Sequence, residues 1–259
     1  MASKKLSGLS MALLAFNEEE SLPIAVKASL EAGRKFAEKS DLSIVVYEGS
    51  TDNTLNVARG LAKKHKNTKV VLQKKGERGY GVALRLAVAN ASREFFFYTD
   101  ADNQFNLGDI GKLLPYLNEA DVVTGYRVNR KDPALRGVIA EAYNWFVWAA
   151  TGYKFVDVDA AFKVYKRKIF KDFALESRTG MIDAEILAKA LAAGHDVKEV
   201  PIEHRARLHG TPVFQGNKLG MVKWSVVKGL LEELNPLARG VAELRKKAKR
   251  AGKIIRWED

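Results

Sequence analysis

The chain has 259 residues, of which 47% are hydrophobic, and its 43 Lys and Arg against 31 Asp and Glu give a formal net charge of +12. This length suffices for one α/β core with a modest appendage, and the positive charge favours anionic partners such as nucleotides, phosphates or lipid headgroups. The absence of cysteine excludes disulfides and thiolate metal sites. No apolar run reaches about eighteen residues, so no transmembrane helix is expected.

Short apolar runs alternate with helical patterns through the first half of the chain. Strands are predicted at Leu9–Phe16, Leu42–Tyr47, Lys69–Gln73, Glu94–Tyr98 and Asp121–Thr124. Helices are predicted between them, at Glu20–Ser40, Asn53–His65, Tyr80–Ala91 and Leu107–Asn118. The first apolar run leads into the acidic segment NEEE, which favours a buried strand over a signal peptide. This alternation is typical of βαβ units, so we predict an α/β fold with a mostly parallel central sheet flanked by helices.

The pattern becomes less regular beyond residue 125. A basic loop, GYRVNRKDPALR, precedes an aromatic helix at Ala140–Thr151, whose Trp145, Phe146 and Trp148 we expect to pack in the core. A second helix is predicted around Ala184–Ala193, and a short strand at Lys198–Pro201. We assign residues 1–215 to this domain.

The C-terminal tail, residues 216–259, is predicted to be helical and basic. The segment MVKWSVVKGLLEEL places its apolar residues on one helical face, and after Asn-Pro, which suits a helix start, VAELRKKAKRAGKIIRW is mostly basic. Two interpretations remain open: a solvated helix that covers the core, or an amphipathic segment that lies on an anionic membrane surface.

Polar side chains follow three predicted strands at the point where each strand ends. Asp100 and Asp102 come directly after the aromatic run FFFYT, Glu18 follows the first strand, and Glu48 follows the second. Ligands of open parallel sheets bind outside the carboxyl ends of the strands, so these side chains should meet at one edge. Carboxylate and amide oxygens at alternating positions, Asp100, Asp102 and Gln104, can converge on Mg²⁺ or Mn²⁺.

Seven segments together resemble the family 2 inverting glycosyltransferases, which have the nucleotide-sugar-binding fold called GT-A. They are AFNEEESL, EGSTDNT, RGYGVALRLAV, YTDADNQF, DVVTGYRVNRKDP, DVDAAFKVYKR and VPIEHRARLHG, and they span roughly residues 8–210. Within that family the chain is most similar to the dolichyl- and polyprenyl-phosphate sugar transferases. The resemblance implies transfer of a hexose from a UDP- or GDP-sugar to a polyprenyl phosphate of the dolichyl type, with Mg²⁺ or Mn²⁺ as cofactor and no nucleic-acid partner.

The resemblance also implies roles for residues of the donor site. Asp100, Asp102 and Gln104 match the family's metal shell, and the metal would stabilise the departing diphosphate. Asn17 and Glu18 match the nucleotide cradle.

Other residues match positions for the nucleobase and the diphosphate. Glu48 stands where the family has an aspartate that reads the nucleobase. Arg127 occupies a position associated with the diphosphate or the acceptor phosphate, and Arg130 could supply a second cation there.

Two sets of residues could serve the acceptor. A lipid phosphate is already anionic and needs cations rather than a base, a role that suits Arg205 and Arg207 in EHRARLHG, with Lys163 or Arg136 nearby.

A sugar hydroxyl, by contrast, must lose a proton, and Asp183 or Glu185 in MIDAEIL would accept it. Both sets are present, so the acceptor class stays open.

The chain departs from the family where Tyr47 and Glu48 replace the usual aspartate pair before Gly-Ser. The departure leaves the choice between UDP and GDP open, and it makes a non-catalytic nucleotide-sugar-binding relative an alternative. A dinucleotide-dependent oxidoreductase is disfavoured because RGYGVALR lacks the Gly-X-Gly-X-X-Gly spacing. We expect a cytoplasmic protein, with a peripheral position on the cytoplasmic membrane face as an alternative.

Overall fold

A computed structural model describes residues 5–128, 134–207 and 224–253, without the side chains of residues 134–136 and 224–227. One sheet holds seven strands: β1 (Leu9–Ala15), β2 (Ser40–Tyr47), β3 (Thr68–Gln73), β4 (Phe95–Asp100), β5 (Val122–Val128), β6 (Phe162–Lys166) and β7 (Val197–Glu203). The helices are α1 (Leu22–Phe36), α2 (Thr54–Lys64), α3 (Tyr80–Asn90), α4 (Ile110–Leu113), α5 (Ala134–Thr151), α6 (Met181–Ala192) and α7 (Trp224–Arg250).

The strand order β3-β2-β1-β4-β6-β5-β7 brings the carboxyl ends of several strands to one edge. Strands β3, β2, β1 and β4 are parallel, and β5 and β7 form a second parallel pair. Strand β6 lies between these groups and is antiparallel to both of its neighbours. The register pairs Leu14 with both Val45 and Asp100, so β1, β2 and β4 end side by side.

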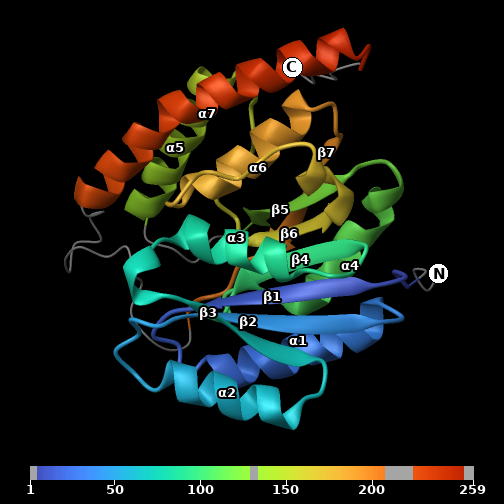
Figure 1. Cartoon of the computed structure of the whole chain (residues 1–259), viewed down its shortest axis with the longest axis vertical. Helices are drawn as coiled ribbons and strands as arrows, with labels where there is room; N and C mark the ends of the chain where they lie inside the picture. Colours follow the sequence, from blue (N-terminus) through green and yellow to red (C-terminus); the bar gives the residue numbers. More distant parts are fainter. Residues whose placement is uncertain (1–4, 129–133, 208–223, 254–259) are drawn as a thin grey trace.

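Helices cover both faces of the sheet, as Figure 1 shows. One hydrophobic core contains buried residues of α1, α2 and α4, and the other contains those of α3, α5, α6 and α7. Strand β4 serves both cores, because alternation points Phe97 to the first and Phe96 and Tyr98 to the second. The ring of Phe97 packs edge-on against Phe162 of β6, with 4.9 Å between ring centroids. The aromatic run is therefore a central strand buried on both faces.

The predicted α/β architecture is confirmed, and four of its elements differ most from the prediction. Strand β6 was not predicted, because lysines interrupt the apolar run of FKVYK. The helix expected at residues 107–118 is largely two 3₁₀ segments around the four residues of α4, and Pro115 is the second residue of the second segment. Helix α5 begins six residues earlier than expected, at Ala134. Helix α7 continues through Pro236 instead of starting there.

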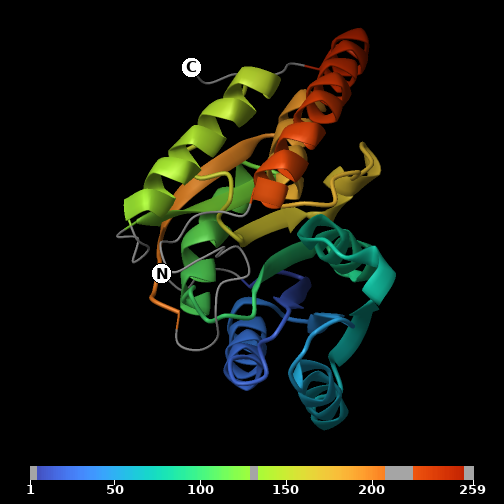
Figure 2. The same cartoon turned by 90° about the vertical axis from the view of Figure 1, so that its left-hand side faces the viewer.

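The C-terminal helix α7 is part of the folded body in the residues described. Its Leu237 and Val241 are buried in the second core, and Figure 2 shows α7 running beside α5 on one side of the sheet. This arrangement corresponds to the first interpretation of the tail, a helix that covers the core. The predicted boundary between residues 215 and 216 lies outside the described residues. Within the described part of the chain, no helix combines the length and the apolar character needed to span a bilayer.

Candidate functional site

The acidic pair follows β4 on a tight turn. Asp100 is the last residue of the strand, and Asp102 is buried and accepts a hydrogen bond from the backbone N–H of Gln104 at 3.1 Å. Asn103 adopts a left-handed backbone with φ of 60°, which asparagine tolerates better than most residues. Its side-chain amide donates to the carbonyl of Ser21 at 2.9 Å. The turn thus anchors both carboxylates at the carboxyl edge of the sheet.

The electrostatics of this turn favour a cation. Burial, together with the carboxylates of Asp102 and Asp183, raises the pKa of Asp100 well above its usual range. A hydrogen bond with the side chain of Tyr80 acts in the opposite direction. Repulsion between crowded carboxylates is relieved by a positive charge placed among them.

An arginine from the segment after β7 supplies such a charge. The Nη1 atom of Arg207 lies 3.3 Å from Oδ2 of Asp102, and its Nη2 atom pairs with Oε1 of Glu18. Burial raises the pKa of Glu18 to about 7, although the guanidinium of Arg207 lowers it. The backbone N–H of Arg205 donates to the carbonyl of Gln104 at 2.8 Å, while the Arg205 side chain is exposed. Glu18, Asp102, Gln104, Arg205 and Arg207 are therefore brought together from three loops.

The loops after β1 and β2 are joined by reciprocal hydrogen bonds. Asn17, with φ of 55°, donates from Nδ2 to Oγ1 of Thr51 at 3.1 Å and accepts from the Thr51 backbone N–H at 2.8 Å. The exposed Glu48 accepts from the backbone N–H of Lys75 at 3.1 Å. The hydroxyl of Tyr47 donates to the Lys75 carbonyl at 2.9 Å. Tyr47 thus fastens this loop, while the Glu48 carboxylate lies at its surface.

Arg127, at the end of β5, is held by a carboxylate that the sequence analysis did not single out. Its Nε and Nη2 atoms each lie 2.7 Å from an oxygen of Asp157, and the side chain is only 10% exposed. Another aspartate, Asp159, lies 4.0 Å from Nη2. Both aspartates lie in the segment DVDAAF, on either side of a buried valine. This spacing is the sequence pattern that could have identified them as partners of Arg127. Asp157 presents the guanidinium in a fixed orientation.

Lys163 lies in the interior instead of facing an acceptor. It is fully buried, and its Nζ atom lies 2.6 Å from Oδ1 of Asp183 and 2.5 Å from the carbonyl of Ala160. The hydroxyl of Tyr98 also pairs with Asp183. A buried lysine needs such partners because burial penalises its charge. Lys163 and Asp183 therefore form an ion pair beneath the acidic turn, with no Lys163 surface left for a lipid phosphate.

Glu185, two residues further along α6, has a comparable structural environment. Its carboxylate accepts backbone N–H bonds from Glu176 and Ser177, each at 2.9 Å, and pairs with Lys189 at 2.7 Å. These contacts fasten the 176–177 loop to α6 and do not involve the acidic turn. Arg130 lies outside the described residues, and of Arg136 only the backbone is described.

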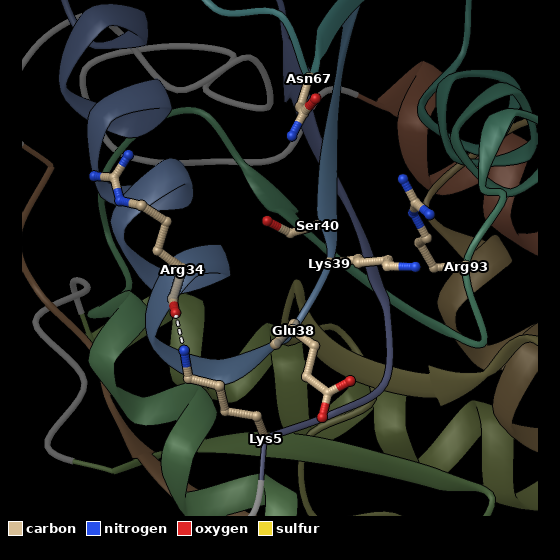
Figure 3. A pocket seen from close by; sticks show the side chains of 8 residues that line it. Lys5, Arg34, Glu38, Lys39, Ser40, Asn67 and Arg93 are labelled. Carbon is tan, nitrogen blue, oxygen red and sulfur yellow. Dashed lines mark hydrogen bonds between the residues drawn. The ribbon is translucent and has the colours of Figure 1, made fainter.

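A separate pocket of about 320 Å³ opens at the opposite edge of the sheet, near the start of β2. Lys5, Arg34, Lys39 and Arg93 line it, together with Glu38. Figure 3 shows the guanidinium of Arg34 turned away from Lys39 and Arg93. These cations do not converge on one point, so the pocket does not form a second anion site.

Comparison with known proteins identifies the family. The family model described as Glycosyl transferase family 2 matches residues 10–178, more than half of the chain. The chain belongs to glycosyl transferase family 2. The matched region includes the acidic turn after β4, Arg127 and the Lys163 strand.

Several curated proteins are similar to this chain in sequence. A dolichyl-phosphate hexose transferase of Haloferax volcanii is 28% identical over 90% of this chain and 98% of its own length. An uncharacterized glycosyltransferase of Mycobacterium tuberculosis is 30% identical over 83% of this chain and 93% of its own. A dodecaprenyl-phosphate galacturonate synthase of Rhizobium johnstonii is 27% identical over 80% of this chain, which spans 61% of that protein. The chain is thus a glycosyltransferase by sequence.

Solved structures establish the GT-A fold of this glycosyltransferase. Glucosyl-3-phosphoglycerate synthase of Mycobacterium tuberculosis in complex with UDP matches with a TM-score of 0.65 and 16% identity over 88% of this chain and 80% of that one. A second structure of that synthase, with Mn²⁺, UDP-glucose and phosphoglyceric acid, matches with a TM-score of 0.62 and 17% identity over 96% and 81%. A third contains Mg²⁺ and UDP.

The carboxylates at the acidic turn of this family 2 enzyme suit a metal ion that is held jointly by the protein and by phosphates of its substrate. Among residues 5–128, 134–207 and 224–253, no group of three His, Asp or Glu side chains is arranged to hold a metal. Mg²⁺ in phosphate chemistry is commonly held by one or two carboxylates together with substrate phosphates and water. Asp100 and Asp102 provide such a pair, and the guanidinium of Arg207 marks a place beside Asp102 where positive charge is accommodated.

Proposed function

We propose that this glycosyltransferase moves a hexose from a UDP- or GDP-sugar to a polyprenyl phosphate, with Mg²⁺ or Mn²⁺ bound at Asp100 and Asp102. The observation that carries the proposal is the meeting of the acidic turn with the cationic segment after β7, where Arg207 contacts both Asp102 and Glu18. A site for an anionic donor and an anionic acceptor needs this combination of metal ligands and arginines. The dolichyl-phosphate hexose transferase and the dodecaprenyl-phosphate galacturonate synthase among its relatives support the same acceptor class.

The metal would be held by Asp100 and Asp102, with the amide of Gln104 beside them. Its contribution when bound is to neutralise the negative charge that develops on the departing diphosphate. Arg127 lies at the carboxyl end of β5 and is oriented by Asp157, so it can add a fixed donor to the same leaving group. The protein's part is to hold these charges in place before the reaction begins.

A phosphate acceptor agrees better with the placement of the carboxylates than a hydroxyl acceptor does. A hydroxyl must transfer its proton to a base. Asp183 is buried in its ion pair with Lys163, and Glu185 accepts backbone hydrogen bonds away from the acidic turn. An ionised phosphate needs no base, and the exposed Arg205 and the bridging Arg207 are suited to bind it.

The donor base depends on the loop after β2. Tyr47 is fastened to Lys75, and its ring packs 5.6 Å from that of Phe16. Glu48 remains at the surface of the loop, where its carboxylate can accept a hydrogen bond from a nucleobase N–H. A uracil and a guanine both offer such a donor, so we keep UDP and GDP as candidates.

Calorimetry with UDP and GDP, with and without Mn²⁺, tests the donor site. We expect nucleotide binding that depends on the metal and that weakens more than about tenfold in Asp102→Asn. The control is Glu119→Gln, which removes the same charge at an exposed position outside the site. Metal-dependent binding that persists unchanged in Asp102→Asn would contradict the metal assignment.

A donor screen against a short polyprenyl phosphate tests the transfer. We expect hexosyl transfer by the wild type and the control variant, and none by Asp102→Asn. Transfer to sugar hydroxyls but not to the lipid phosphate would overturn the acceptor assignment. Metal-dependent nucleotide binding without transfer to any acceptor would instead indicate a non-catalytic relative.

A further inference from the structure

Helix α5 exposes five large apolar side chains, and the exposed Glu141 interrupts them. Val138 is 64% exposed, Trp145 56%, Trp148 44%, Phe146 43% and Ile139 37%. Their spacing places them on one side of the helix, which we call the α5 apolar face. Single exposed apolar residues are normal, but two tryptophans and a phenylalanine on four successive positions of one helix form a patch that indicates an interaction surface.

The orientation of α5 is fixed by contacts on its opposite side. Val147 is fully buried in the second core, and the hydroxyl of Tyr143 donates to the Gly180 carbonyl at 3.4 Å. Asn144 donates to the Val156 carbonyl at 2.8 Å, which ties the exposed Val156 to the end of the patch. The core packing expected for Trp145, Phe146 and Trp148 is thus not what the structure shows, because Val147 and Tyr143 fill that side.

Cations border the α5 apolar face where α5 meets α7. The guanidinium of Arg245 stacks over the ring of Tyr153, 4.3 Å from its centroid, and donates to the carbonyl of Thr151 at the end of α5. Lys154 is exposed just beyond α5, and Lys246 and Lys249 are exposed on α7. Figure 2 shows α5 and α7 side by side on the same side of the sheet. Among residues 137–151 of α5, Glu141 is the only charged side chain.

We propose that the α5 apolar face docks the enzyme on the interface of an anionic lipid bilayer. Tryptophan is favoured at the headgroup level, because its ring is apolar and its N–H can remain hydrated. An apolar helix face beside lysines and arginines matches the interface of an anionic bilayer, where apolar acyl chains lie beneath negatively charged headgroups. A soluble protein partner would not call for the bordering cations, and this charge complementarity favours lipid over a second copy of the chain.

Docking of α5 would bring the site to the membrane surface. Five residues separate Val128, the end of β5, from Ala134, the start of α5, so the two are at most about 20 Å of extended chain apart. Arg127 is next to that end of β5. This consequence rests on the proposed function, since only a lipid acceptor requires the carboxyl edge of the sheet to lie near the headgroups.

Vesicle co-sedimentation tests the docking without any turnover. The full chain is mixed with phosphatidylcholine vesicles that contain or lack phosphatidylglycerol, at low and high salt. We expect retention on the anionic vesicles that falls as salt rises. Trp145→Ser combined with Trp148→Ser should weaken retention about tenfold or more. The matched control is Ile24→Ser combined with Leu72→Ser, which removes exposed apolar side chains from α1 and β3 and should leave retention unchanged.

Three further measurements make the result decisive. Thermal unfolding of both double variants must match the wild type, so that a loss of retention reports the surface. Calorimetric measurement of UDP or GDP binding separates the two proposals. Docking can fail while nucleotide binding persists, and nucleotide binding can fail while docking persists. Retention that the tryptophan variant keeps would overturn the docking. A second outcome would also overturn it. In this outcome, light scattering without lipid shows a dimer for the wild type and a monomer for the tryptophan variant, and vesicles retain neither protein.

Discussion

Replacing Lys163 by methionine should destabilise the enzyme strongly, because it leaves the carboxylate of Asp183 buried without its cation. The Lys163 and Asp183 side chains are 0% and 1% exposed, and their charged atoms lie 2.6 Å apart. Removing one partner of such a pair typically costs about 3–5 kcal/mol of unfolding free energy. For a chain of this size that loss lowers the melting temperature by roughly 10 °C. Urea unfolding followed by circular dichroism measures it.

Two further variants distinguish the cost of a buried, unpaired charge from the cost of lost side-chain packing. Lys163→Met combined with Asp183→Leu removes both charges, and we expect it to lose only about 2 kcal/mol, because the buried Tyr98 hydroxyl then loses its hydrogen bonds to both side chains. Lys168→Met breaks a surface pair with Asp121 at 3.1 Å and should cost less than about 1 kcal/mol. A double variant that is as unstable as the sum of its single variants would refute the reasoning.

Three further predictions concern pH, backbone and the leaving group. Burial raises the pKa of Asp121, but His195, Lys166 and Lys168 outweigh it and lower the pKa to about 2, so stability present above about pH 4 should be lost as the pH falls toward 2. Acid titration of unfolding should show this loss in the wild type and a weaker one in Asp121→Asn. Asn103→Ala should cost about 1 kcal/mol because of its positive φ, whereas Asn103→Gly should be tolerated better, as thermal melts can show. Arg127→Lys loses the bidentate pair with Asp157 and should lower kcat about a hundredfold. The control Arg93→Lys alters a partly exposed pair with Asp41 and should leave kcat unchanged. Equal kcat values for the two variants would contradict a role for Arg127.

The alternating first half of the fold was predictable because its signals are local. The run FFFYT reads as a buried strand, and the acids after it could be placed at the carboxyl edge by the rule for parallel sheets. Strand β6 was missed because Lys163 breaks its apolar pattern, and only the distant Asp183 makes burial of that lysine possible. A pattern of single residues carries no information about such a partner.

Faces and partners were harder to predict than elements. The periodicity of α5 identifies a helix, but it does not tell whether Trp145 and Trp148 meet the core or the surroundings, since both faces of the helix carry apolar residues. In the same way Arg127 could be predicted as a phosphate ligand, whereas its partner Asp157 lies 30 residues away in sequence and became evident only when β5 and β6 were placed in the sheet.

The reversed direction of β6 has a consequence for how the enzyme can vary. Because β6 runs against β5, the excursion that leaves the sheet after Val128 and returns at Phe162 starts and finishes at the same edge. This connection, residues 129–161, is one continuous segment of the chain that contains α5. Exchanging α5 while keeping Asp157, which orients Arg127, leaves the pairing of Val123 with Val164 in place, so a new surface can be introduced beside an unchanged donor site.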